Sequence, residues 1–187
     1  MIFFRLLTED TRNAALTDVN SYSDVEVGDW YNTAVSTMSA LGIIKGYPDG
    51  TFKPNNFITR AEFAAIAARF DDHVSTGAVS FTDIAGHWAE EEVSRAAELG
   101  WVTGYPDGTF RPDRYITRAE AMTLINRVLI RNPETVEDLL EEMPIWKDNA
   151  DPDCWYYIAV QEASISHYYD RKTNGTEFWT GLRPDVW

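Results

Sequence analysis

The chain has 187 residues, of which 44% are hydrophobic and 13% aromatic, so it can bury a core, and wholesale disorder is excluded. Its 16 basic and 30 acidic residues give a net charge of −14, which excludes a general binder of nucleic acids or anionic membranes. The single cysteine, Cys154, excludes an intrachain disulfide framework, and no apolar run approaches the ~18 residues of a membrane span.

The first segment, residues 1–16, precedes the first regular pattern of the chain. Residues 1–7 lack the basic region and cleavage site of a signal peptide, so we expect none in this chain. They line up loosely with the end of a later helix if Arg5 is aligned with Arg69 and Arg127. We therefore interpret residues 1–16 as the tail of a truncated preceding repeat. We further hypothesise that residues 1–7 pack where the second helix of a third copy would lie.

Residues 17–74 predict a unit of two helices joined by a loop. Apolar residues recur at helical spacing over residues 34–41, and Gly42 stands where a helix-ending glycine belongs. Residues 47–50, Tyr-Pro-Asp-Gly, have the chemistry of a β-turn. Residues 59–62, Thr-Arg-Ala-Glu, form a capping box, which predicts that a second helix begins there.

Residues 75–133 repeat this plan. The heptapeptide GYPDGTF at residues 46–52 recurs at 104–110, and ITRAE at 58–62 recurs at 116–120, both with a shift of 58 residues (46 to 104, and 58 to 116). Two long words in one register indicate a module copied in tandem. Such an array is more typical of repeated binding surfaces than of a single catalytic centre.

Residues 134–187 depart from the plan. The acidic stretch 134–142 predicts a helix or a linker, and residues 155–160 echo residues 30–35, which predicts a third first helix. Neither signature word follows it. Aromatic residues are dense from Trp146 to Trp187, and we interpret this segment as a degenerate third repeat or a C-terminal cap, in preference to an aromatic glycan platform.

The two words and the first-helix pattern before them, over residues 22–131, resemble the S-layer homology (SLH) family. The resemblance implies a mainly α fold of tandem helix–loop–helix repeats, which such proteins often arrange around a pseudo-threefold axis. It also implies non-covalent anchoring of a surface protein to the bacterial cell wall. The partner would be an acidic, pyruvylated secondary cell-wall polysaccharide, and the location extracellular, at the cell wall or surface layer.

Arg60 and Arg118 are the first candidates for binding. Each follows its capping Thr, so it occupies the first helical position, where a cation opposes the helix dipole at a cost of about 0.3–1 kcal/mol. Backbone N–H groups at a helix start together with a guanidinium suit a carboxylate such as a pyruvate ketal. The alternative is a structural ion pair, to Asp24, Asp83 or an acid of a neighbouring repeat. The residues alone favour neither, and the family resemblance favours binding.

Four aromatic side chains are further candidates. Trp30 and Trp88 precede the first helix of each repeat and could stack on a sugar, although core anchoring is the commoner role of such an indole and is favoured here. Tyr47 and Tyr105 begin the turn, where their hydroxyl groups could reach a glycan. Their alternative role is to cover the hydrophobic core.

Paired glycines and acids complete the candidate set. Gly46 and Gly104 either let a ligand approach the backbone or serve only a turn with positive φ. Asp24 and Asp83 lie in repeated aromatic-x-Asp openings. For them we favour hydrogen bonds to loop N–H groups over orientation of a binding arginine.

Enzymatic function is not predicted. The acids recur with the repeat, whereas a glycosidase needs two placed uniquely about one bond. No nucleotide loop, zinc spacing or serine elbow occurs in the sequence, so we expect no cofactor and no metal. The alternative function is a self-assembling module that contacts other surface-layer subunits without binding glycan.

Overall fold

The computed structural model describes residues 1–72 and 74–184, so Trp187, counted above among the C-terminal aromatic residues, lies outside the described part. The chain forms two compact units. The first unit comprises Met1–Glu98 together with Gly104–Tyr115, and the second unit comprises Leu99–Thr103 together with the described part of Ile116–Trp187. The loop that carries the second GYPDGTF word therefore folds with the first repeat.

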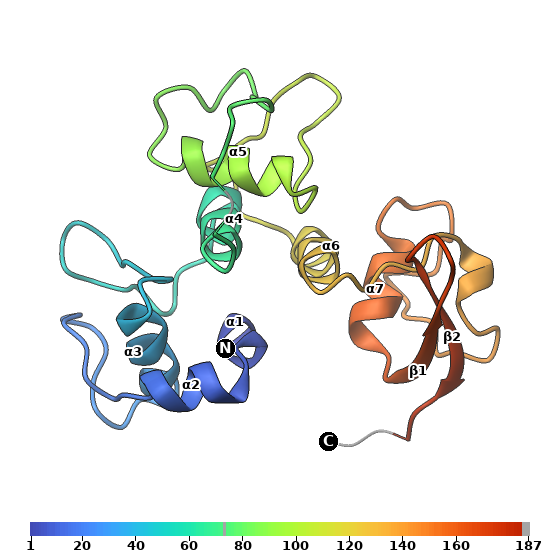
Figure 1. Ribbon diagram of the computed structural model, residues 1–187, viewed down its shortest axis with the longest axis horizontal. Coiled ribbons are helices and arrows are strands. Elements are labelled where there is room, and N and C mark those ends of the chain that lie inside the picture. Colours follow the sequence, from blue (N-terminus) through green and yellow to red (C-terminus); the bar gives the residue numbers. More distant parts are fainter. Residues whose placement is uncertain (73, 185–187) are drawn as a thin grey trace. The chain divides into compact units, whose positions relative to one another are not determined.

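The described residues contain short helices and one hairpin, which Figure 1 labels along the chain. The helices are α1 (Ile2–Leu6), α2 (Glu9–Ala15), α3 (Asn32–Ala40), α4 (Arg60–Ala68), α5 (Glu90–Glu98), α6 (Arg118–Val128), the 3-10 turn η1 (Val136–Asp138) and α7 (Tyr157–Ser164). The strands β1 (His167–Arg171) and β2 (Glu177–Leu182) pair antiparallel, with a register shift between Tyr168 and Tyr169.

The expected mainly α class is wrong for this chain. Only about a third of the residues are helical, because the helices are short and long loops separate them. A two-stranded sheet follows α7, the first helix of the third copy. Its second strand alternates buried and exposed side chains at first, with Glu177 and Trp179 inward, which is the period of a strand and not of a helix.

The helix boundaries predicted within the two repeats are confirmed. Thr59 and Thr117 cap α4 and α6, and each has the reciprocal hydrogen bonds of a capping box with a glutamate three residues later. Helix α3 ends before Gly42, whose φ of 72° suits a residue without a side chain. Small residues on α4 and α5, including Ala64, Ala67 and Ala96, are fully buried. They let these two helices pack closely in the first unit.

The N-terminal segment folds onto the first unit. Phe3 of α1 is buried, and its ring centroid lies 4.9 Å from that of Phe63 and 5.7 Å from that of Phe70. Contacts of α1 with α3 complete this packing. The segment thus contributes to the core of the first unit, and its hypothesised place in a third copy stays a prediction.

We expect Phe3→Ala to lower the free energy of unfolding of the first unit by about 3 kcal/mol, because it removes a ring from a closed aromatic cluster. Ile2→Ala is the matched control, since the side chain of Ile2 is exposed. Chemical denaturation of both variants measures the difference. Equal stability of the two would show that α1 is not docked.

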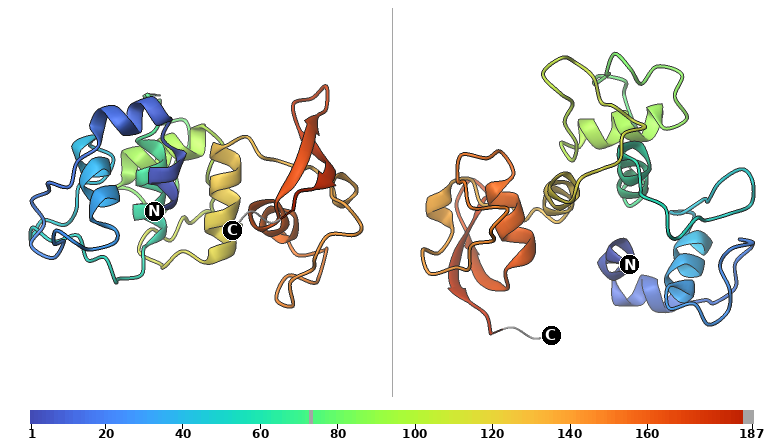
Figure 2. Two further views of the ribbon diagram at one scale, coloured as in Figure 1. Left: turned by 90° about the horizontal axis from the view of Figure 1, so that it is seen from below. Right: turned by 180° about the vertical axis from the view of Figure 1, so that it is seen from behind.

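The second unit is held by a hairpin packed on α7. Leu139, Met143, Tyr157 and Trp179 form its hydrophobic cluster, and Figure 2 shows the hairpin beside α7. The acidic stretch 134–142 contains only the single turn η1, which is fixed by the ion pair between Lys172 and Asp138 at 2.6 Å. The predicted third first helix is confirmed as α7.

A charged cluster is buried beneath this hairpin. Arg131 donates from Nε to Glu177 at 2.9 Å, and its Nη2 lies 2.6 Å from Glu162 and 2.8 Å from Nε2 of His167. His167 stacks on Trp179 with ring centroids 3.9 Å apart, and the Trp179 indole N–H donates to Glu162. Two carboxylates thus face one guanidinium and one imidazole, and one additional proton would neutralise the cluster.

Burial raises the pKa of the Glu177 carboxyl, the nearby Glu162 charge raises it further, and Arg131 opposes both. A raised pKa contributes stability at pH values below about 4.3, the unfolded value, and this contribution is lost as pH rises through the folded pKa. Glu177→Gln mimics the protonated acid and keeps an acceptor for Arg131. We expect the variant to melt above the wild type at about pH 8, with the difference shrinking towards about pH 4.

Thermal denaturation of the two proteins across this pH range tests the expectation. Glu141→Gln is the control, because Glu141 is exposed. A difference between Glu177→Gln and the wild type that does not change with pH would contradict it.

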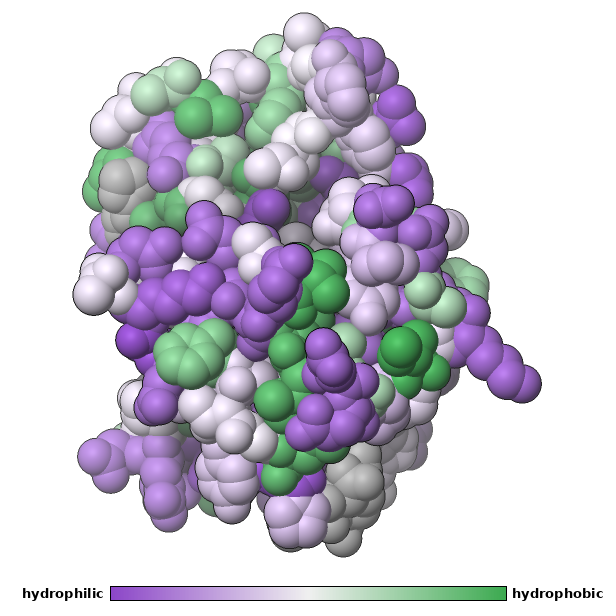
Figure 3. Space-filling view, turned by 90° about the vertical axis from the view of Figure 1, so that its right-hand side faces the viewer, coloured by the Kyte–Doolittle hydropathy of each residue, from purple (hydrophilic) through white to green (hydrophobic). Residues whose placement is uncertain are grey.

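The surface is largely polar. Figure 3 shows one face on which hydrophilic side chains predominate and apolar ones gather in small patches, in keeping with the net charge of −14. Within residues 1–72 and 74–184, every helix is too short or too polar to cross a membrane.

Candidate functional site

The two GYPDGTF loops are built by one repeated device. Asp24 accepts hydrogen bonds at 2.7 Å from the N–H groups of Phe52 and Lys53, and Asp83 accepts the equivalent pair from Phe110 and Arg111. The hydrogen bond from Phe52 lowers the pKa of Asp24. The favoured interpretation of the two acids as acceptors of loop N–H groups is confirmed.

This device holds a basic residue in the left-handed region in each loop. Lys53 has a φ of 57° and Arg111 a φ of 59°, which costs a residue with a side chain about 1 kcal/mol or more. Each cation lies over the tyrosine of its own loop, 4.3 Å from the Tyr47 ring centroid and 3.9 Å from that of Tyr105. In both copies, the strained left-handed conformation therefore places a cation on the face of an aromatic ring.

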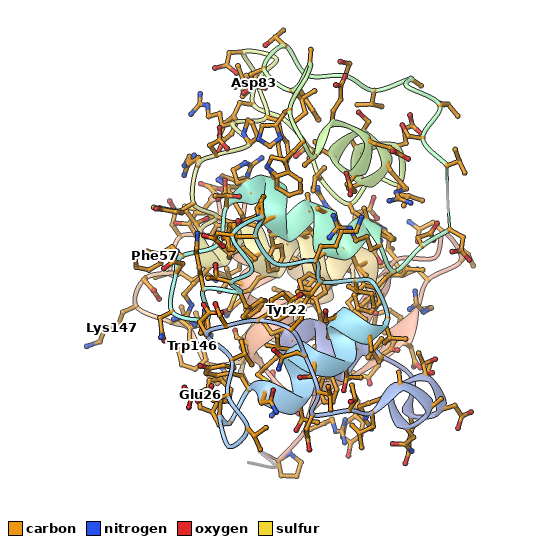
Figure 4. All side chains as sticks on the ribbon, turned by 90° about the vertical axis from the view of Figure 1, so that its left-hand side faces the viewer. Tyr22, Glu26, Phe57, Asp83, Trp146 and Lys147 are labelled. Atoms are coloured by element: carbon orange, nitrogen blue, oxygen red, sulfur yellow. The ribbon has the colours of Figure 1, made fainter. Side chains whose placement is uncertain are left out.

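The loop glycines are explained by the packing of the protein itself. A Cβ atom on Gly46 would lie 2.3 Å from the Tyr22 ring, and one on Gly104 would lie 2.5 Å from the Phe81 ring. Gly46 has a φ of 64°, whereas Gly104 has no positive φ, so the turn alternative holds for Gly46 only. Figure 4 labels Tyr22 and Asp83, one residue from each of the two aromatic-x-Asp openings.

Three arginines surround Tyr105. The guanidinium carbon of Arg111 lies 3.9 Å from its ring centroid, that of Arg60 5.0 Å and that of Arg114 5.7 Å. Arg114 also donates a hydrogen bond to the Tyr105 hydroxyl group. Arg111 pairs with Asp107 at 3.0 Å, an exposed pair of small energetic value. We call Arg60, Arg111, Arg114 and Tyr105 the arginine cluster.

Arg60 is held in this cluster by the repeat-two loop. Its side chain is 8% exposed, its Nε donates to the Phe110 carbonyl at 2.8 Å, and its guanidinium lies 4.6 Å from the Phe110 ring centroid. The backbone N–H of Arg60 donates to the Arg114 carbonyl at 2.9 Å, and that of Ala61 to the Pro112 carbonyl at 3.0 Å.

The expectation that the start of α4 offers its backbone N–H groups to an anion is therefore wrong. Its first two N–H groups bind carbonyl groups of the repeat-two loop, and the third, of Glu62, donates to the capping Thr59 side chain. An anion at this place would be met by side chains instead of a helix end.

Arg118 has a different environment from Arg60, although the two occupy the same repeat position. It begins α6 after the capping Thr117 and is exposed. The sequence explains the difference, because α4 is followed by a complete GYPDGTF loop that covers Arg60, whereas no further copy of that loop follows α6.

Tyr47 is a fixed hydrogen-bond donor. Its hydroxyl group donates to Glu62 at 2.5 Å, and Glu62 is also the capping-box acid of α4. Burial, followed by this hydrogen bond to a carboxylate, raises the pKa of Tyr47 to about 12. The phenol therefore stays protonated at neutral pH.

Both candidate tryptophans lie on the surface, so the favoured role as core anchors is wrong. Trp30 is 77% exposed and Trp88 is 59% exposed, and Trp155, at the equivalent place in the third copy, is 66% exposed. A pocket of about 500 Å³ adjoins Trp88. It is lined by Ser75, Thr76, Gly77, His87, Trp88, Glu90, Glu91 and Ser94.

One group of side chains has the composition of a metal site. Ligand atoms of Glu162, His167 and Glu177 lie within 4.8 Å of one another. Arg131 binds each of these residues, so the guanidinium already occupies the centre of the group. We interpret it as an internal ion-pair network of the second unit.

Comparison with known protein families assigns the repeats. The model of the S-layer homology domain matches residues 21–64 and 80–122, which contain α3, α5 and the starts of α4 and α6. The chain belongs to the S-layer homology family. The resemblance drawn from the two signature words is thereby confirmed.

Relatives of this SLH chain include two proteins of Acetivibrio thermocellus. Cell surface glycoprotein 1 is 35% identical over 181 residues, which is 90% of this chain and 8% of the relative. The cellulosome-anchoring protein is 34% identical over 184 residues, which is 95% of this chain and 40% of the relative. An amylopullulanase of Thermoanaerobacterium thermosulfurigenes is 40% identical over 117 residues, 58% of this chain and 6% of the enzyme. The SLH chain thus spans less than half the length of each of these relatives.

Sequence reasoning missed three cations of the SLH loops, namely Lys53, Arg111 and Arg114. A signal for two of them was present, because residues 53 and 111 are equivalent positions of the repeat and both are basic in an acidic chain. Arg114 has no such signal, since Asn56 occupies its place in the first repeat.

We expect Asp83→Asn to loosen the second SLH loop, because an amide offers only one acceptor oxygen to the two N–H groups of Phe110 and Arg111. Amide hydrogen exchange at these residues should accelerate by about tenfold or more. Exposed Asp153 supplies the control as Asp153→Asn. Unchanged exchange at both amides would show that the carboxylate does not hold the loop.

Proposed function

We propose that this chain anchors a surface protein non-covalently to the bacterial cell wall by binding an acidic secondary cell-wall polysaccharide that carries pyruvate ketals. The repeat boundaries 17–74 and 75–133, between a truncated tail at 1–16 and a degenerate unit at 134–187, belong to the same proposal. The relatives, which include a cellulosome-anchoring protein, support the anchoring part. The arginine cluster supports the polysaccharide part.

The single observation that carries the proposal is the gathering of three guanidinium groups around Tyr105 in a chain of net charge −14. Three cations around one ring make this a local concentration of positive charge, which would attract an anionic ligand to an otherwise acidic chain. A ketal carboxylate fits it chemically, because guanidinium forks bind carboxylates in two parallel hydrogen bonds.

The other candidate residues take supporting roles in this proposal. Arg60 and Tyr105 shape the floor of the site, and Arg111 and Arg114 are its exposed cations. Asp83 and Gly104 fix the loop from which they project. The exposed rings of Trp30 and Trp88 offer faces on which sugars stack.

Two weaker sites are part of the same proposal, one in the first repeat and one in the second unit. In the first repeat, Lys53 over Tyr47 is the counterpart of Arg111 over Tyr105, with Asp24 and Gly46 building the loop. In the second unit, Arg118 stands at the start of α6 without a following GYPDGTF loop. We therefore assign the strongest binding to the arginine cluster and expect one dominant site in each chain.

Co-sedimentation with purified cell-wall sacculi tests the proposal, before and after mild acid removes the pyruvate ketals. The key variant is Arg111→Gly with Arg114→Ala. Glycine relieves the left-handed strain at residue 111, worth about 1 kcal/mol, so the variant should be as stable as the wild type while it binds sacculi at least about tenfold more weakly.

Lys147→Ala controls for the loss of one positive charge from an exposed position in the second unit, and should sediment like the wild type. Equal sedimentation of the arginine variant and the wild type would defeat the site assignment. Sedimentation that survives removal of the ketals would defeat the pyruvylated ligand. Concentration-dependent self-association without wall material would favour a surface-layer assembly module instead.

A further inference from the structure

Phe57 and Tyr115 form an aromatic pair on the surface of the first unit. They are equivalent residues of the two repeats, each directly before the ITRAE word. A bridge between Thr59 and Tyr115 brings the two chain segments together antiparallel. The ring centroids lie 5.5 Å apart with an interplanar angle of 48°. The same position of two successive repeats thus contributes to one contiguous patch.

Packing alone does not explain this pair. Phe57 is 79% exposed and Tyr115 is 60% exposed, so most of both rings faces solvent in spite of their contact. Figure 4 shows Phe57 at the outer edge of the structure. Singly exposed apolar residues are normal on protein surfaces, but adjoining large rings that stay exposed are typical of binding sites.

The patch is continuous with the arginine cluster. Tyr115 follows Arg114, which donates to the Tyr105 hydroxyl group, and the Arg114 carbonyl accepts from the N–H of Arg60. Aromatic faces and guanidinium groups therefore adjoin one another where segments of the two repeats meet.

We propose that Phe57 and Tyr115 are a stacking subsite for the pyranose ring next to the acidic sugar of the polymer. This inference rests on the proposed function. A sugar ring has an apolar C–H face that suits an aromatic ring and hydroxyl groups that suit the surrounding polar groups. The cations select for an acidic sugar, and the aromatic pair selects for a neighbouring sugar whose ring can stack on it. The pair thereby sets which polymers are bound, beyond their charge.

The test is calorimetric titration of the full chain with pyruvylated secondary cell-wall polysaccharide released from sacculi. Phe57→Ala with Tyr115→Ala should bind roughly ten- to a hundredfold more weakly, because the sugar can no longer bury the apolar surface of two rings. The dependence of the affinity on salt should stay that of the wild type, since no charge is removed. The swap Phe57→Tyr with Tyr115→Phe keeps both rings and should retain the affinity.

Tyr168→Ala is the matched control, because it removes a comparably exposed ring from the second unit. Thermal denaturation should show the wild type and the Phe57/Tyr115 variant to be about equally stable, since the pair buries little surface.

The outcomes separate this inference from the proposed function. If the alanine pair binds like the wild type while Arg111→Gly with Arg114→Ala does not bind, the stacking subsite is overturned and the anchoring function stands. If the wild type itself fails to bind the polymer, the proposed function fails first. If the wild type dimerises in sedimentation velocity and the alanine pair does not, the patch is a contact between copies of this chain and the inference is overturned.

Discussion

The first unit depends on two backbone hydrogen bonds that join consecutive repeats. The N–H groups of Arg60 and Ala61, at the start of α4, donate to carbonyl groups of the loop that carries the second GYPDGTF word. A helix start needs acceptors for its first N–H groups, and here another repeat provides two of them. The repeat is therefore not the unit of folding, because the second helix of one copy is completed by the loop of the next.

This interlock also creates the candidate site. Once the loop is bound to α4, Arg60 lies under Phe110 and beside Tyr105, and the loop brings Arg111 and Arg114 to the same ring. Asp83 is the second requirement, since its carboxylate holds Arg111 in the left-handed conformation that points a cation at the tyrosine. Structural hydrogen bonds thus concentrate positive charge in a chain whose overall charge is strongly negative.

The third copy shows what happens when the loop word is lost. Its first helix, α7, persists, but a hairpin follows in place of the loop and second helix. The buried cluster of Arg131, Glu162, His167 and Glu177 then fixes the hairpin. In the second unit, charged side chains therefore stabilise the interior, whereas in the first unit the arginine cluster forms the candidate binding site. Removal of Arg131 from this cluster would be costly, because two buried carboxylates would lose the cation that they share.

The sequence by itself determined the repeat, its 58-residue period, both capping boxes, the family and the loop-binding role of Asp24 and Asp83, because each depends on local hydrogen bonds or on words read directly from the chain. Only the tertiary structure decided that Arg60 is covered and Arg118 exposed, that the tryptophans lie outside the core, and that Phe57 meets Tyr115. These features arise from contacts between segments about fifty or more residues apart. Local propensity and periodicity carry no information about such contacts.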